Sequence, residues 1–60
     1  MEGLVTEYAL VGGEGERELV REVNSYIRSG YQPLGGPLIY APLDRQPVLF
    51  QAMVVLSRHP

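Results

Sequence analysis

The residues best suited to bind a ligand lie in and after a pair of adjacent glycines. Gly35 and Gly36 allow a ligand to approach the backbone closely, because glycine has no side chain in the way. Tyr40 offers an aromatic face for stacking, and Arg45 can pair with an anion. These residues predict a site for a nucleotide-like small molecule at a subunit junction. We favour a second interpretation of the glycine pair, a bulge or bend, because glycine in a strand most often marks backbone geometry.

Side chains that could catalyse a reaction are scarce. The 60 residues include no cysteine and no lysine, and His59 is the one histidine. The sequence suggests no pair of buried carboxyl groups that could share the roles of general acid and general base. We therefore expect a protein that is not an enzyme, with no catalytic residue and no cofactor.

Two patterns resemble metal or phosphate sites but fit them poorly. Glu14, Glu18 and Glu22 lie one helical turn apart, yet nothing supplies a second set of ligands, so we expect a solvated face and no metal. The glycine-rich run 12–15 departs from both the phosphate loop and the dinucleotide-binding fingerprint. Its neighbouring carboxylates would repel an anion, and they suit the first turn of a helix instead.

The charge and the hydropathy pattern limit the choice of partners. The formal net charge is −2 and there is no basic patch, so nucleic acid is not an expected partner. The longest purely apolar run, residues 52–56, is far too short to cross a bilayer, and no basic segment with an apolar stretch opens the sequence. We expect a cytoplasmic protein that has no membrane partner.

A predicted helix and the turn that ends it organise the chain. Residues 16–29 place apolar side chains at helical spacing along one stripe, which consists of Leu19, Val20, Val23, Tyr26 and Ile27. Gly30 follows as the residue that adopts a left-handed conformation after a helix. Tyr31 comes next, where an apolar side chain folds back on the last turn.

Three predicted strands complete an α+β fold. The first spans residues 4–11 and the third spans 48–58, and residues 38–41 extend the second past the glycine pair. A stiff loop between prolines joins the second and third strands at 42–47. Residues 1–60 therefore form a single domain, a β-α-β-β unit whose three-stranded sheet has one helix packed on one face. The prolines of the second strand favour an edge and the apolar third strand favours the centre, which predicts the order 1-3-2. An order with the first strand central is the alternative.

Both faces of this sheet are apolar, and one helix covers one face only. We expect the helix on the uncharged side of the first strand, which carries Leu4, Thr6, Tyr8 and Leu10. The opposite face is then a predicted interface between identical subunits, in a homodimer or a higher closed oligomer. Its residues are Val5, Ala9, Val11, Leu49, Gln51, Met53 and Val55. Gln51 is expected to form a hydrogen bond across the symmetry axis.

Several short segments resemble a family of short bacterial and phage proteins, catalogued as domain of unknown function seventeen thirty-seven. They are Tyr8–Val11, Val23-Asn24, Ile27, the run 30–36 and Gln51–Met53. Tyr31 stands where many members carry tryptophan. The family has no established activity, so the resemblance implies no site residue. The expected function is therefore a small, non-catalytic, self-associating protein with a binding or accessory role, and the small-molecule binder is the alternative.

Overall fold

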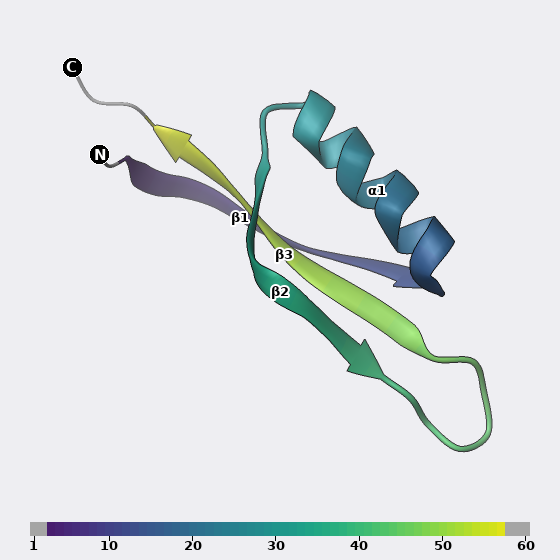
Figure 1. The fold of residues 1–60 in the computed structure, drawn as a ribbon. Coiled ribbons are helices and arrows are strands. Elements are labelled where there is room, and N and C mark those ends of the chain that lie inside the picture. The colour runs from purple at the N-terminus through teal and green to yellow at the C-terminus, as the bar shows by residue number, and fades with distance from the viewer. Residues whose placement is uncertain (1–2, 58–60) are drawn as a thin grey trace.

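The computed structural model describes residues 3–57 and contains four elements (Figure 1). They are β1 (Leu4–Glu14), α1 (Glu16–Arg28), β2 (Gln32–Tyr40) and β3 (Val48–Ser57). The sheet has the order β1-β3-β2, and β3 pairs antiparallel with both neighbours. The helix packs on one face of this sheet, so the predicted α+β fold and the order 1-3-2 are confirmed.

The first strand is longer than predicted, because it continues through Gly12 and Gly13 to Glu14. A Cβ atom on Gly12 would lie 2.9 Å from a carbon of the Phe50 ring, and one on Gly13 would lie 2.7 Å from the backbone nitrogen of Leu19. These glycines are therefore part of the strand. Their missing side chains make room for an aromatic ring on one face and for the helix backbone on the other.

The two ends of α1 differ: the N-cap residue Gly15 has no side-chain cap, whereas the C-terminal end is capped by backbone hydrogen bonds. At the start, the Glu14 backbone N–H donates to the Glu18 carboxylate (3.1 Å). At the end, Gly30 has φ +102° and donates to the carbonyl of Ile27, while the Tyr31 N–H donates to the carbonyl of Tyr26. This is the Schellman pattern, and it confirms the predicted roles of Gly30 and Tyr31. The Tyr26 and Tyr31 rings meet edge to face, 5.1 Å apart.

The second strand lies on both sides of the glycine pair, and its pairing with β3 is interrupted. Leu34 pairs with Ala52 and Leu38 pairs with Phe50, so the segment between them bulges from the ladder. The bulge is held by a side chain, because Gln51 Nε2 donates to the carbonyls of Leu34 (3.2 Å) and Gly35 (3.1 Å). Gln51 is buried and bonds within its own chain, so its predicted role across a symmetry axis is wrong in this chain.

The prediction of which face carries the helix was also wrong. Val11, Leu19 and Met53 form the buried core, and Ala9 and Leu49 pack against it. The predicted interface set, which comprised Val5, Ala9, Val11, Leu49, Gln51, Met53 and Val55, therefore lies largely on the helix side. The helix follows the smaller side chains, because its backbone must approach the strand at Gly13. Val5 is the exception: a register shift between Val5 and Glu7 pairs it with Leu56.

The molecule is elongated for its length. The Cα radius of gyration is 13.2 Å, whereas a compact chain of this length has about 10 Å. The principal extents are 50 × 17 × 14 Å, and the 13-residue helix is only about 20 Å long. In Figure 1 the β2–β3 hairpin runs on past the first turn of α1. In residues 3–57, no helix is long and apolar enough to cross a membrane.

Candidate self-association surface

Within residues 3–57, no element covers the side of the sheet away from α1, and we call this side the open face. The pairing register places on it the even-numbered residues of β3 and the residues that pair with them. Phe50 belongs to this side, because its ring lies against Gly12, whereas the helix lies against Gly13. The larger side chains of the open face are Val5, Tyr8, Leu10, Leu34, Leu38, Tyr40, Phe50 and Leu56.

The open face is apolar and exposed. Tyr8 is 63% exposed, Leu10 is 58% exposed and Leu38 is 68% exposed. From Tyr8 to Gly12 of β1, and along the described lengths of β2 and β3, the positions on this face carry no charge. The carboxylate of Glu14 belongs to the margin, where β1 ends opposite Val48. This surface has the composition of a protein interior, although only Val54 near its middle is fully buried.

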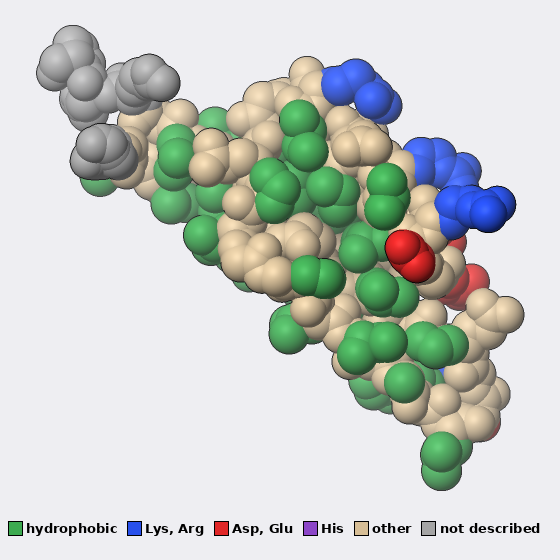
Figure 2. Space-filling view, viewed as in Figure 1, with side chains coloured by type: hydrophobic (Ala, Val, Ile, Leu, Met, Phe, Trp, Pro, Cys, Tyr) green, Lys and Arg blue, Asp and Glu red, His purple; other side chains and the backbone are tan. Residues whose placement is uncertain are grey.

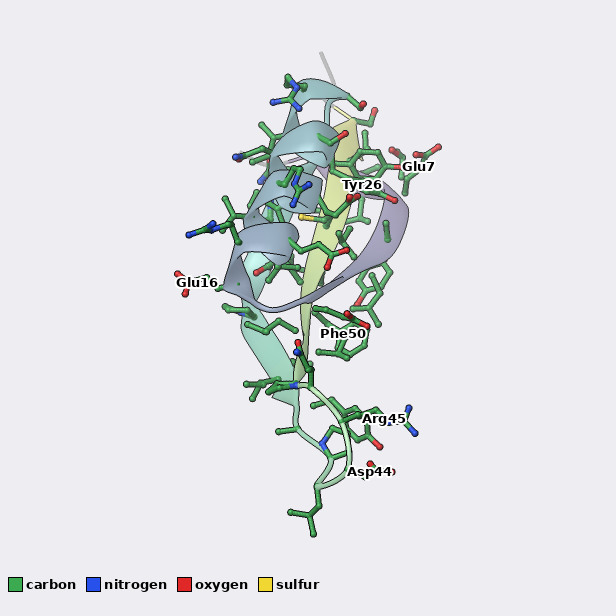
Figure 3. All side chains as sticks on the ribbon, turned by 90° about the vertical axis from the view of Figure 1, so that its right-hand side faces the viewer. Glu7, Glu16, Tyr26, Asp44, Arg45 and Phe50 are labelled. Carbon is green, nitrogen blue, oxygen red and sulfur yellow. The ribbon has the colours of Figure 1, made fainter. Side chains whose placement is uncertain are left out.

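The helix side differs between its two flanks. On the β1 flank, the Tyr31 hydroxyl donates to the Glu7 carboxylate (2.7 Å), and this hydrogen bond raises the pKa of Tyr31 above its usual range. On the other flank, Glu16, Arg17 and Val20 line an open hollow of about 320 Å³. Figure 3 shows Glu16 on the opposite side of the ribbon from Glu7 and Tyr26. The first flank is closed by side chains of its own chain, and the second is not.

The residues predicted to bind a small molecule are not gathered in one place. Gly35 and Gly36 lie in the bulge of β2, and no atom would contact a Cβ on either of them within 4 Å. Tyr40 is five residues further along, about 15 Å in an extended strand. Arg45 lies in the hairpin loop beside Asp44, with 3.6 Å between Nε and Oδ1. Within one chain, the four residues follow an edge and do not enclose a ligand.

Sequence reasoning missed most residues of the open face. Both faces of the predicted sheet are apolar, which indicated that one face would lack a cover but did not indicate which one. The pair Gly12-Gly13 does not separate the faces in the sequence, because the two residues face opposite sides and only the structure places the helix at Gly13. Figure 2 also shows hydrophobic side chains extending from the charged helix edge to the hairpin.

Comparison with known proteins adds no relative to this description. No family model, no curated protein and no solved structure matches the chain. The resemblance to the short bacterial and phage family therefore stays a prediction, and the function is argued from the geometry alone.

Proposed function

We propose that this chain is a small, non-catalytic, self-associating protein with a binding or accessory role, and that its open face packs on the open face of a second copy. The observation that carries the proposal is the continuous, uncharged and exposed apolar surface of the sheet. Monomeric proteins rarely expose a contiguous apolar patch larger than a few hundred Å². A second copy offers a surface of the same kind, as a two-fold contact requires.

The accessible surface area supports this occupant. The chain exposes 4667 Å², whereas a folded monomer of 6.7 kDa exposes about 3,900 Å². The excess of roughly 750 Å² is close to the ~800 Å² that each partner buries in a stable protein–protein interface. The buried core is also small: in residues 3–57 its hydrophobic side chains are those of Val11, Leu19, Met53 and Val54. Stacking of the two sheets would supply the second half of a hydrophobic core.

The experiment measures the mass of the assembly by sedimentation and light scattering at micromolar concentration. We expect the wild-type chain to be larger than a monomer. Leu10→Glu places a charge in the open face and should abolish the stacked contact, because an unpaired carboxylate would be buried there. Ile27→Glu is the matched control, since Ile27 is an exposed apolar residue of the helix.

The two variants are expected to differ in the mass of the assembly. Leu10→Glu should lower the mass and Ile27→Glu should leave it unchanged, with both chains folded by circular dichroism. A wild-type chain that is monomeric at all concentrations would contradict the proposal. A folded Leu10→Glu variant with the wild-type mass would contradict it as well.

A further inference from the structure

The tip of the β2–β3 hairpin carries a leucine with no contacts to protect it. Leu43 is 106% exposed, and it lies between Pro42 and Pro47 in the loop that joins the strands. Each proline has one backbone torsion angle fixed by its ring, which restricts the two ends of this loop. Asp44 and Arg45 follow directly, and both are largely exposed. The tip therefore presents one apolar side chain, then an acid, then a base.

The hollow on the free flank of α1 has the matching arrangement. Val20 supplies its apolar wall and is 51% exposed, while Glu16 and Arg17 supply an acid and a base. Its volume of about 320 Å³ leaves room for a leucine side chain. Figure 3 shows Asp44 and Arg45 at the far end of the hairpin, beyond the first turn of the helix where Glu16 lies. In this structure the tip of a chain does not fill the hollow of the same chain.

We propose that the hairpin tip of one copy docks into the hollow of another copy. Leu43 would then pack on Val20. Asp44 would pair with Arg17 and Arg45 with Glu16, and these contacts would replace the exposed Asp44–Arg45 pair of the single chain. The charges on the two surfaces are complementary, which favours one orientation of the contact. Two prolines hold the tip in shape before binding, which reduces the conformational entropy lost on association.

This contact builds on the proposed self-association, but it uses a different surface. The helix and the open face lie on opposite sides of the sheet, so the copy that stacks on the open face is not the copy that fills the hollow. Together the two contacts give an assembly that is larger than a dimer. Each chain contributes a tip and a hollow, as well as its open face.

The test compares wild-type chain with Leu43→Asp by sedimentation velocity over a range of concentrations. We expect an assembly larger than a dimer for the wild type and a dimer for Leu43→Asp. Loss of one buried leucine side chain should weaken the tip contact at least tenfold. Leu43 is fully exposed in the single chain, so the substitution should leave the fold intact, as circular dichroism would verify.

Charge reversal tests the orientation of the contact. Arg17→Asp alone and Asp44→Arg alone should each weaken the larger assembly, and the double variant should recover part of the loss. Such recovery is expected only if the two side chains face each other. Failure of the double variant to recover any affinity would overturn the assigned pairing.

The outcomes separate this inference from the face-stacking proposal. If Leu10→Glu lowers the mass and Leu43→Asp does not, the tip contact is wrong and stacking survives. If Leu43→Asp lowers the mass and Leu10→Glu does not, stacking is wrong and the tip contact survives. A wild-type chain that is monomeric throughout overturns both.

Discussion

The two glycine pairs of this protein have opposite reasons for being glycine. Gly12-Gly13 lies in β1, where added Cβ atoms would meet Phe50 and the backbone of Leu19. Gly35-Gly36 lies in the bulge of β2, where no atom would come within 4 Å of an added Cβ and Gly35 has φ +72°. The first pair provides space and the second provides a backbone conformation. The same dipeptide therefore marks close packing in one strand and an irregular edge in the other.

The largest expected effect comes from Gly13→Ala. The added methyl group would lie 2.7 Å from a backbone nitrogen, which cannot move without the helix. We expect a loss of about 3 kcal/mol in the free energy of unfolding, measured by urea denaturation. Gly36→Ala is the matched control and should change stability by less than about 0.5 kcal/mol. Equal losses for the two variants would remove the distinction between the glycine pairs.

Gln51→Leu tests whether the Gln51 side chain holds the bulge of β2. The substitution keeps the apolar bulk but leaves the carbonyls of Leu34 and Gly35 without their donor. We expect a loss of about 2 kcal/mol, because the variant loses two side-chain hydrogen bonds that each contribute about 0.5–1.5 kcal/mol net. Faster hydrogen exchange in β2 than in β1 should accompany it. An unchanged unfolding free energy would mean that the backbone alone fixes the bulge.

Gly35→Ala isolates the cost of the backbone conformation. Since the position has φ +72° and empty space around it, alanine would be strained without any clash. We expect a loss of about 1 kcal/mol, and a smaller loss for Gly35→Asn, because asparagine tolerates the left-handed region better. Thermal unfolding of the two variants measures this difference. If both variants were as stable as the wild type, the conformation of Gly35 would not be required.

The smallest effect concerns the β1 flank of the helix side, where Tyr31 bonds to Glu7. The hydrogen bond to Glu7 raises the pKa of Tyr31 above its usual value of ~10. The folded state holds this proton more tightly than the unfolded state, so the contribution is complete below pH ~10 and is lost as pH rises through the raised pKa. Tyr31→Phe should reduce the loss of stability as the pH rises above ~10, measured by urea unfolding. Glu7→Gln should do the same, and an unaltered pH profile in both variants would contradict this assignment.

The arrangement of the elements was predictable from the sequence, because it depends on strong local signals. The helical stripe, Gly30 after the helix and the prolines of β2 were sufficient for the strand order and for the cap. The choice of face was not predictable from side-chain size and charge. It depends on how closely the helix approaches Gly13, which is a property of the packed structure.

The sequence predicted that an uncovered apolar face exists, but it did not predict which residues form it. Apolar residues on both faces of β3 indicated that one face of the sheet would be left uncovered, and the structure has such a face. Of the residues named for it, only Val5 lies on this face, since the assignment of the helix had been inverted. The hollow beside Val20 had no signal in the sequence, because it depends on how three side chains of α1 are arranged in space.

The position of β3 at the centre of the sheet also determines when the fold can form. β1 and β2 pair only with β3, which is the last of the three strands in the chain. During synthesis, neither earlier strand has a partner until β3 has left the ribosome. The apolar first strand must therefore wait unpaired while the helix and the second strand are made, and sheet formation is a single late event.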